Sequence, residues 1–410
     1  MKINLRHHPK TLLALVFILA GVTATWFLFR VSKKPKAPVL VRLSWDTIDT
    51  PITLQRRDLV ISGLSKSILL LKDSIKGDKL TVSGLPVSRQ ALLSSLMRLK
   101  ALIENASSPD ALLQSLKKEF IPYEIRNGLE ANDKPILVTG YFQPRFKGSY
   151  KATKDYAFPV YGWPPDLIKV NLKRFSPSLP PKNLWGRISG RQLVPYYSRK
   201  DIETKRPLPE KLAICWLSSP VDVLELQIQG SAIIDIEGGP SRYIHYAASN
   251  GLCYKSIGKV LIQRGLLRPE GLDWPVIRKW AEKHPERFQQ VLFENPRYIF
   301  FKWEKRGPVG CYGQVLVPGT SAALDPSVYP PGIAAFLTIK WPRIADGPEW
   351  FKNRPKTLLV VNHDKGSAIK GPFRLDLYCG SGEAAGFLAG RLKNRARLII
   401  LLERSMKLEN

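Results

Sequence analysis

The chain is poor in acidic residues relative to basic ones. Its 410 residues include 34 Asp or Glu and 63 Lys or Arg, which gives a formal net charge of +29. The first 36 residues hold seven of the basic residues and no acid, so the rest of the chain still carries +22. A surplus spread over the whole chain indicates an anionic partner, which could be nucleic acid, a membrane surface or an acidic cell-wall polymer.

Cysteine is also scarce, and no pair is spaced C-x-x-C, which excludes a zinc ribbon and a thioredoxin-type redox motif. The four cysteines are Cys215, Cys253, Cys311 and Cys379. They could form up to two disulfides in an exported protein, but a chain of this length can build a core without them. The sequence leaves both states open.

The signatures of several enzyme classes are missing. There is no G-x-x-x-x-G-K-[ST] phosphate loop, no H-E-x-x-H metal helix and no G-x-S-x-G nucleophile elbow. His363 and Asp364 are adjacent, but no third metal ligand is evident, so we expect neither a metal nor another cofactor. No RNA- or DNA-binding signature accompanies the positive charge, so a nucleic-acid partner is not expected.

Residues 1–36 are typical of a targeting segment. An uncharged run of 19 residues, Thr11–Phe29, lies between basic clusters, and about 20 apolar residues span a bilayer as a helix. The run could be a retained membrane anchor or a cleaved export signal, for which Val22 and Ala24 offer a weak cleavage pattern. Basic residues stand on both sides, so the positive-inside rule does not decide the orientation.

The remaining chain is predicted to be mainly β with some helices. Ser88 is a candidate helix cap followed by leucines at helical spacing, and a second leucine stripe follows Pro109. Short apolar or alternating runs predict strands at 135–140, 221–228, 297–303, 334–340, 357–361 and 398–402. Further helices are expected at 243–249, 258–264, 274–283 and 383–392. Many short strands with few long helices are typical of one or two β-barrels.

The densest polar cluster lies within residues 361–382. A predicted strand leads into Asp364, and a second short strand carries Asp376 between two leucines. Apolar neighbours would desolvate the Asp376 carboxyl, raise its pKa and let it donate a proton near neutral pH. Lys370 and Arg374 would oppose that shift. Alternatively, the two aspartates cap turns or pair with these cations.

A row of amides forms the next candidate site. On the predicted strand 221–228, Glu225, Gln227 and Gln229 would share one face, and Gly230-Ser231 follows directly. Such a row suits hydrogen bonds to sugar hydroxyls and N-acetyl groups, although a solvated edge strand would read the same way.

Two isolated residues are weaker candidates. Asp325 precedes a proline, a pattern that usually marks a turn. His245 stands alone among apolar and aromatic neighbours, which is more typical of a structural histidine than of a catalytic one.

Several short blocks occur in order along the chain, among them T-G-Y-F-Q-P at 139–144, L-Q-I-Q-G-S at 226–231 and S-A-A-L-D-P at 321–326. With these blocks the chain resembles the membrane-bound lytic murein transglycosylase A family and its C-terminal 3D domain, named for three aspartates. The other matching blocks are 158–162, 243–265, 295–301 and 364–382. Each is weak alone, but together they extend over roughly residues 139–400, about two-thirds of the chain.

The resemblance implies a fold of two β domains. A double-psi β-barrel would be assembled from segments before and after an inserted second β-barrel, with a sugar-binding cleft between them. The expected segments are the N-terminal anchor or signal 1–36, the first barrel part with its helical N-terminal region 37–165, the insert 166–307 and the second barrel part 308–410.

The resemblance also implies a peptidoglycan lytic exotransglycosylase. Such an enzyme cleaves the β-1,4 bond between N-acetylmuramic acid and N-acetylglucosamine without water and leaves a 1,6-anhydro ring. By motif match Asp376 corresponds to the catalytic acid, and Asp364 and Asp325 correspond to companion aspartates. The residues expected to contact the glycan are Tyr141, Gln227, Gln229, Gly230, Ser231, Asn250 and Lys370.

The expected setting follows from the same resemblance. We expect a monomer on the periplasmic side of the cell envelope, with glycan strands as partner and a membrane contact through residues 11–29. The chain departs from the family pattern at Lys365, where a small or neutral residue usually follows the first aspartate, and it lacks the lipid-anchor cysteine. An expansin-like protein that binds the wall without cleaving it is the alternative, although the Asp364–Asp376 block argues against it.

Overall fold

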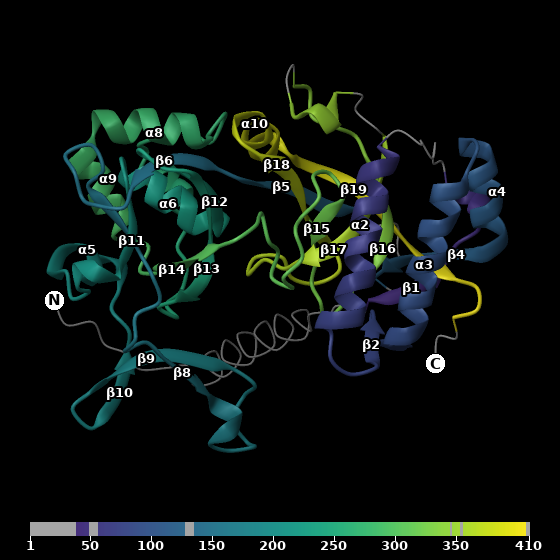
Figure 1. Cartoon of the computed structure of the whole chain (residues 1–410), viewed down its shortest axis with the longest axis horizontal. Helices are drawn as coiled ribbons and strands as arrows, with labels where there is room; N and C mark the ends of the chain where they lie inside the picture. The colour runs from purple at the N-terminus through teal and green to yellow at the C-terminus, as the bar shows by residue number, and fades with distance from the viewer. Residues whose placement is uncertain (1–37, 49–55, 128–134, 345–346, 353–355, 407–410) are drawn as a thin grey trace, which may run out of the picture.

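The computed structural model describes residues 38–48, 56–127, 135–344, 347–352 and 356–406. The expected anchor Thr11–Phe29 lies outside these residues. No helix in the described ranges is both long and apolar enough to cross a membrane. Two lobes of sheet stand side by side, and a third, smaller sheet projects from one of them (Figure 1).

The first lobe is built on an eight-stranded sheet in the order β1-β4-β19-β16-β17-β15-β18-β5. Because β19 also pairs with β5, the strands from β19 to β5 close into a barrel. The strands are β1 Val39–Arg42, β4 Phe120–Arg126, β5 Ile136–Gln143, β15 Ser321–Ala323, β16 Ala334–Ile339, β17 Thr357–Asp364, β18 Arg374–Ser381 and β19 Lys393–Glu403. The barrel therefore joins segments far apart in the sequence.

The second lobe is a six-stranded sheet in the order β14-β13-β12-β6-β11-β7. Its strands are β6 Arg145–Ser149, β7 Phe158–Tyr161, β11 Ala213–Leu217, β12 Ser231–Ile236, β13 Ser241–Ser249 and β14 Ile299–Glu304. Only Pro144 separates β5 from β6, so the chain passes directly from one sheet to the other. β6 and β7 thus lie in the second sheet, although residues up to 165 were expected with the first domain.

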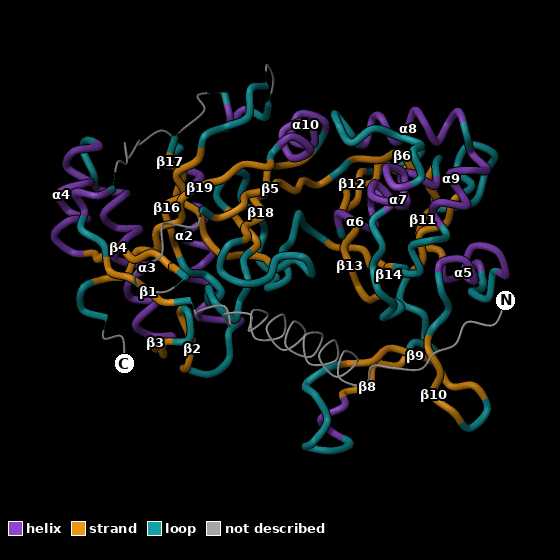
Figure 2. The backbone as a smooth tube through the Cα atoms, turned by 180° about the vertical axis from the view of Figure 1, so that it is seen from behind, coloured by secondary structure: helices purple, strands orange, loops and turns teal. Residues whose placement is uncertain are grey.

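The smaller sheets have three and two strands. The projecting one has the order β10-β9-β8 and consists of β8 Ile168–Asn171, β9 Asn183–Ser189 and β10 Gln192–Pro195. Figure 2 shows it extending away from the second lobe. The other is the hairpin β2 Lys79–Val82 and β3 Leu85–Ser88, which lies in the chain between helices α2 and α3 of the first lobe.

Helices cover the outside of both lobes. They are α2 Arg57–Leu69, α3 Arg89–Asn105, α4 Pro109–Glu119, α5 Arg199–Lys205, α6 Pro220–Gln229, α7 Ile257–Gln263, α8 Trp274–Lys283, α9 Pro285–Leu292 and α10 Glu383–Arg391. Short 3-10 or π turns are Trp45–Thr47, Leu70–Ser74, Leu172–Arg174, Glu210–Leu212 and Glu349–Phe351. The Ser88 hydroxyl accepts from the backbone N–H groups of Gln90 and Ala91, which confirms the predicted cap of α3.

Two element predictions were wrong. Residues 221–228 are helical, because the Ser219 side chain caps the N-terminus and Pro220 occupies the first turn, where no backbone N–H is needed. Residues 243–249 form β13, which pairs on both edges with β12 and β14. Helices at 258–264, 274–283 and 383–392, and the strands near 136, 299, 334, 357 and 398, are confirmed within a few residues.

Separate apolar cores stabilise the two lobes. The barrel core continues beneath α3 and α4, where the predicted leucine stripes are buried. The second sheet packs one face over its own core, and helices α6 to α9 enclose another. All four cysteines are free thiols, two buried and two exposed, so the structure holds its fold without the disulfides that the sequence left open.

Candidate active site

Strand register brings two of the predicted aspartates to one face of the barrel. Ala323 on the short strand β15 pairs with Asp364 on one side and with Asp376 on the other. Residues directly opposite one another on paired strands project from the same face. Adjacent strands are about 4.8 Å apart, so the two Cα atoms are separated by roughly 10 Å. In the sequence a loop separates these aspartates, whereas in the barrel the pairing of β15 with both β17 and β18 brings them close together.

The Asp376 side chain is half-buried on β18, between two buried leucines. Thr139, its partner on β5, donates a hydrogen bond from Oγ1 to Asp376 Oδ1 at 2.7 Å. Burial raises the pKa of Asp376 to about 6, and the charge of Asp364 acts in the same direction. The Thr139 hydrogen bond and the Arg374 charge oppose the rise, but burial outweighs them. This carboxyl can therefore hold and release a proton near neutral pH.

Asp364 is held by three donors. Its Oδ1 accepts from the backbone N–H groups of Cys311 and Lys365, each at 2.9 Å, and its Oδ2 accepts from the Tyr141 hydroxyl at 3.2 Å. Three donors and no acceptor suit an ionised carboxylate. The Lys365 side chain is exposed and forms no ion pair with any described carboxylate. The unusual cation after the first aspartate therefore contributes its backbone here.

Asp325 has a different role in the geometry. Its Oδ1 accepts from the backbone N–H and hydroxyl of Ser327, and its Oδ2 accepts from the backbone N–H of Gly371 at 2.7 Å. Burial acts to raise the pKa of Asp325, but these hydrogen bonds and the nearby Lys370 charge outweigh it and lower the pKa. Asp325 thus fixes the loop that leads from Asp364 to Asp376.

Two tyrosines lie beside the aspartates. The rings of Tyr141 and Tyr378 are 5.4 Å apart, and these residues pair across β5 and β18 two positions after Thr139 and Asp376. Burial and the negative charges of both aspartates raise the pKa of Tyr141 well above its ordinary value. Its hydroxyl therefore stays protonated and can donate. Tyr141 was among the residues expected to contact the glycan, whereas Tyr378 was not.

The residue directly before Asp364 on β17, His363, is buried. The two ring nitrogens of His363 lie 2.8 Å from the hydroxyls of Ser67 and Ser321. Burial, with the Lys66 charge, lowers the pKa of His363 to about 3, so the ring is neutral. Both nitrogens are occupied by serines, which leaves none to bind a metal. No group of three metal-ligating side chains was found in the described ranges.

The predicted amide row is divided by the helix that replaces the predicted strand. Gln227 is buried, and its side-chain oxygen accepts from the buried Arg199. Gln229 is half-buried at the end of α6, and Gly230 ends the helix in the left-handed region with φ +79°. The three polar residues of the run therefore do not share one face, and Gln227 serves the interior of the second lobe.

Asn250 is also an interior residue. It is fully buried, and its Nδ2 donates to the carbonyl oxygens of Tyr197 and Pro296 at 2.9 and 2.8 Å. Its Oδ1 accepts from the backbone N–H of Tyr298 at 3.0 Å. With its amide used in this way, Asn250 braces the end of β13 and has no group left for direct contact with a sugar.

His245 lies on the second sheet, within range of the Asp364 charge. It pairs with Ser231 on β12 and Lys302 on β14, so these three residues share one face of that sheet. Burial lowers the pKa of His245, whereas the negative charge of Asp364 acts to raise it, which places the two side chains within electrostatic range. Its Nδ1 is buried and has no hydrogen-bond partner among the described residues. The sequence suggested only a structural histidine here.

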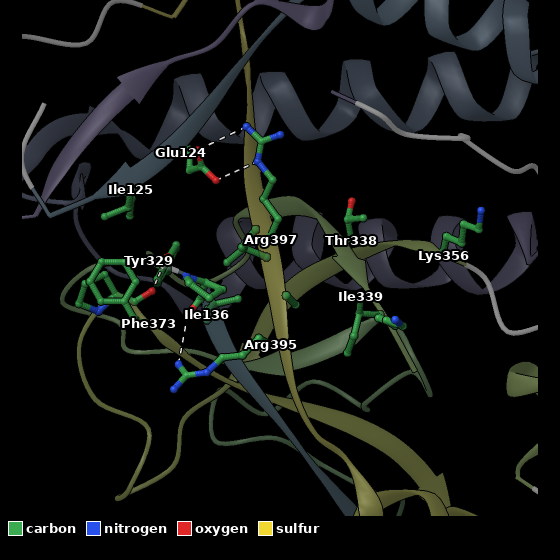
Figure 3. A pocket seen from close by; sticks show the side chains of 15 residues that line it. Glu124, Ile125, Ile136, Tyr329, Thr338, Ile339, Lys356, Phe373, Arg395 and Arg397 are labelled. Atoms are coloured by element: carbon green, nitrogen blue, oxygen red, sulfur yellow. Dashed lines mark hydrogen bonds and ion pairs between the residues drawn. The ribbon is translucent and has the colours of Figure 1, made fainter. Parts of the chain in front are cut away.

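A cavity of about 580 Å³ lies elsewhere on the barrel. It is lined by the end of β4, the start of β5 and parts of β16 and β19, and it includes Ile136, Phe373 and Arg395 (Figure 3). Arg397 pairs with Glu124 at its edge. None of the candidate site residues lines it. Its walls combine aliphatic side chains with Glu124, lysines and arginines, and it lies apart from the residues around Asp376.

Fold and site together define a two-lobed β protein whose closed barrel presents paired aspartates toward a second sheet. The family model "MltA specific insert domain" matches residues 137–302, and the "3D domain" model matches residues 320–402. The chain therefore belongs to the MltA family, the membrane-bound lytic murein transglycosylases A.

Similar proteins agree with this placement. The membrane-bound lytic murein transglycosylase A of Escherichia coli (strain K12) is 32% identical over 269 residues, and the match spans 65% of each chain. The chain thus matches a little under two-thirds of the length of this curated relative. A crystal structure of a membrane-bound lytic murein transglycosylase from Agrobacterium tumefaciens superposes with a TM-score of 0.71 at 26% identity and covers 89% of this chain and 98% of that one.

A second solved structure shows the shared fold. E. coli MltA with bound chitohexaose has a TM-score of 0.62 at 24% identity, and the match covers 90% of this chain and 94% of that chain. The mainly β architecture with barrels and some helices is therefore the family's fold.

Proposed function

We propose that this protein is a lytic transglycosylase that cleaves the β-1,4 bond between N-acetylmuramic acid and N-acetylglucosamine in peptidoglycan. The product would carry a 1,6-anhydro ring. The observation that carries the proposal is the half-buried Asp376 carboxyl beside Thr139 and Asp364, whose pKa, raised to about 6, lets it act as an acid and then as a base. The names of the relatives and the glycan bound to the E. coli protein support the same substrate class.

In the proposed reaction one carboxyl acts twice, first as an acid and then as a base. Protonated Asp376 gives its proton to the glycosidic oxygen as the bond from C1 to that oxygen breaks, and the N-acetylglucosamine hydroxyl leaves. The Asp376 carboxylate then takes the proton of the muramoyl 6-hydroxyl as O6 bonds to C1. Asp376 ends protonated, and no water is consumed, so the second carboxylate of a hydrolase is not required.

Asp364 would stabilise the positive charge that develops at C1. It is fixed by the Cys311 and Lys365 N–H groups and by Tyr141, so it needs no reorganisation when the charge appears. We propose that the sugar chain lies between this face of the barrel and the second sheet. Tyr141, Gln229, Gly230, Ser231 and Lys370 remain the proposed glycan contacts, while Asp325, Gln227 and Asn250 hold the surrounding elements.

We further propose the finer architecture and setting. The closed barrel of the first lobe would be of the double-psi type, with the second lobe as its insert. Because β6 and β7 belong to the second lobe, the barrel segments would be near 37–143 and 308–410, and the first one is shorter than the expected 37–165. The protein would act as a monomer on the periplasmic side of the cell envelope, exported or anchored through residues 11–29. The registers of β15 with β17 and of β18 with β5, which are the parallel pairs of the barrel, support this topology.

Mass spectrometry of products from purified peptidoglycan tests the function. We expect muropeptides whose reducing end is lighter by one water, about 18 mass units, than a hydrolysed end. Asp376→Asn should reduce this release by at least ~10² while leaving the circular dichroism spectrum unchanged. Asp155→Asn, at an exposed carboxyl remote from the barrel strands, is the matched control and should retain full activity.

Two outcomes would contradict the proposal. Products with hydrolysed ends would show a glycosidase that uses water. Binding to whole sacculi with no soluble product would instead indicate the expansin-like, non-cleaving alternative.

A further inference from the structure

The projecting β8–β10 sheet has one face made of apolar residues. Its register pairs Val170 with Leu184 and Leu193 with Ile188, and Ile168 and Pro195 both lie opposite Gly186. Since paired residues and alternate residues of a strand share a face, all of these side chains project to one side. We call this side the apolar face; its residues are Ile168, Val170, Leu184, Ile188, Leu193 and Pro195.

The apolar face is exposed. The side chains of Leu184, Ile188 and Leu193 are 43%, 58% and 44% accessible, and Phe175, in the loop between β8 and β9, is 74% accessible. Isolated apolar residues on a surface are ordinary, but a contiguous patch on a regular sheet indicates a binding surface. Figure 2 shows that this sheet extends away from the lobe that carries it.

The opposite face attaches the sheet to the molecule. Arg187 stacks on the Tyr197 ring at 4.3 Å, and the rings of Trp163 and Trp185 are 5.8 Å apart. Gly251 comes so close to Trp185 that a Cβ there would lie 2.7 Å from the Trp185 side chain. The sheet is therefore held in a fixed orientation through one face, and the apolar face is left toward the outside.

Positive charge surrounds the apolar face. Residues 163–195 contain six Lys or Arg and one acid, Asp166, which accepts a hydrogen bond from Tyr196. Lys173 and Arg174 directly precede the exposed Phe175, and Arg191 stands at the turn between β9 and β10. None of these three cations forms an ion pair with a described carboxylate.

This combination selects among partners. A second copy of the chain would bring two strongly basic surfaces together, which their repulsion disfavours. A glycan would be served by aromatic rings and hydrogen-bonding groups, and the apolar face offers aliphatic side chains. A bilayer containing anionic lipids matches both features, because its interface accepts apolar side chains and its headgroups attract Lys and Arg.

We propose that the apolar face of the β8–β10 sheet docks on a lipid bilayer surface that contains anionic headgroups. Ile188 and Leu193 enter the interface together with Phe175, and Lys173, Arg174 and Arg191 contact the headgroups. This contact lies outside the proposed catalytic residues and is separate from the apolar run Thr11–Phe29. Where that run is retained as an anchor, it would raise the effective concentration of the sheet at the surface, so a weak contact is enough.

Site-specific fluorescence on the full chain tests the proposal. The chain with Cys253→Ser and Cys311→Ser, which lacks exposed thiols, is given Ile188→Cys and labelled with an environment-sensitive dye. It is reconstituted into vesicles of phosphatidylcholine with about one-third phosphatidylglycerol, a content that gives an anionic surface. We expect a blue shift of the dye emission and quenching by brominated lipid chains. Ser189→Cys, the next residue on the other face of β9, is the matched control and should show neither.

The charge contribution is tested with a second variant. Lys173→Glu with Arg174→Glu should reduce the quenching at position 188, and so should replacing phosphatidylglycerol with phosphatidylcholine. Activity on soluble peptidoglycan fragments is measured separately, on Lys173→Glu with Arg174→Glu in the chain that keeps Cys311. It should stay unchanged, so this test and the Asp376 test fail independently.

Three results would overturn the proposal. The dye at position 188 could remain in water in anionic vesicles. Equal quenching at positions 188 and 189 would show that the sheet has no preferred face toward lipid. A lipid-free blue shift that grows with protein concentration, together with a doubled mass, would show that a second copy covers the face.

Discussion

The Asp376 carboxyl lies on a β-strand between Leu375 and Leu377, both fully buried. That flanking is visible in the sequence, and so is the opposing charge of Arg374. The sequence did not show whether the pKa of Asp376 would rise or fall, because this depends on how much water reaches the carboxyl in the folded chain. Burial decides it and raises the pKa to about 6.

The raised pKa has a consequence for activity. The protonated form of Asp376 is the proposed acid, so we expect kcat/KM to fall as the pH rises above about 6. A pH profile on soluble peptidoglycan fragments measures this directly. A kcat/KM that rises between pH 6 and 8 would show that another group supplies the proton.

The same shift affects stability. Below about pH 4 the carboxyl is protonated in both folded and unfolded chains, and between about 4 and 6 only the unfolded chain ionises. The free energy of unfolding therefore falls as the pH rises through this window. Asp376→Asn removes the penalty, so the variant should exceed the parent by on the order of 1–3 kcal/mol at neutral pH. Urea unfolding at several pH values tests this, and the two proteins should converge in acid.

The pKa shift of His363 makes stability depend on pH in the opposite direction. Its pKa is lowered to about 3, so the unfolded chain takes up a proton below about pH 6.5 while the folded chain does not. The parent protein should lose stability as the pH falls from about 6.5 toward 3. His363→Asn lacks this group, and it should be less stable than the parent at neutral pH because two serine hydrogen bonds are disturbed. The difference should narrow in acid, and a constant difference would contradict the neutral, buried ring.

Other residues of the site could not be read from the sequence. Tyr378 carries no signal apart from its position two residues after Asp376. His245 lies 119 positions before Asp364, and only the packing of one sheet toward the other reveals their electrostatic coupling. Asn250 and Gln227 were predicted to contact the glycan because they lie in sequence blocks that resemble the family. Such a resemblance does not distinguish a residue that contacts a ligand from one that holds the backbone.

At the scale of the elements, the loop before β15 packs too closely on the barrel to allow a side chain at residue 310. Gly310 packs against the barrel so closely that a Cβ there would lie 2.4 Å from the carbonyl oxygen of His363. The next residue, Cys311, donates its N–H to Asp364. The loop can therefore reach the carboxylate only because residue 310 has no side chain.

Gly310→Ala should lower activity by moving this loop. Losing one preorganised donor to a charged group at an active site typically costs about 10²-fold in kcat. We expect a loss of about that size in kcat, with a smaller change in KM. Gly258→Ala is the matched control, because its Cβ would make an ordinary contact at 3.4 Å within α7. Unchanged kcat in Gly310→Ala would show that the Cys311 N–H is dispensable.

The element predictions failed where local pattern and tertiary context disagree. The run 221–228 alternates in a way that suits a strand, but Ser219 and Pro220 supply a helix start that the alternation hides. The run 243–249 is rich in aromatic and small residues, and its pairing with two neighbouring strands decides for β structure. By contrast, the capping role of Ser88 can be recognised from the local sequence, so the start of α3 was predicted correctly.

For the whole molecule, the dominant physical quantity is charge. A net charge of +29 should steer the protein toward a wall whose peptides carry carboxylates. We expect kcat/KM on peptidoglycan to fall as ionic strength rises from about 0.05 to about 0.5 M, mainly through KM. Binding of uncharged chitohexaose is the control and should depend little on salt. A salt-independent KM on peptidoglycan would show that the surplus charge serves another partner.

The sequence predicted the general architecture, but it did not predict which strands belong to which lobe. Short runs and turn residues indicated barrels, but nothing local showed that β6 follows β5 into another sheet after a single proline. That assignment depends on pairing partners more than 60 residues away, such as β11 and β12.

The barrel closes through its last strand, and this has a consequence for biogenesis. β19 pairs with β4, β5 and β16, so the ring stays open until residues 393–403 have left the ribosome. The intervening lobe can assemble earlier, because its strands all precede residue 305. A chain that stops before residue 393 would thus hold the strands of the second sheet but no closed barrel, and the proposed catalytic face would be incomplete.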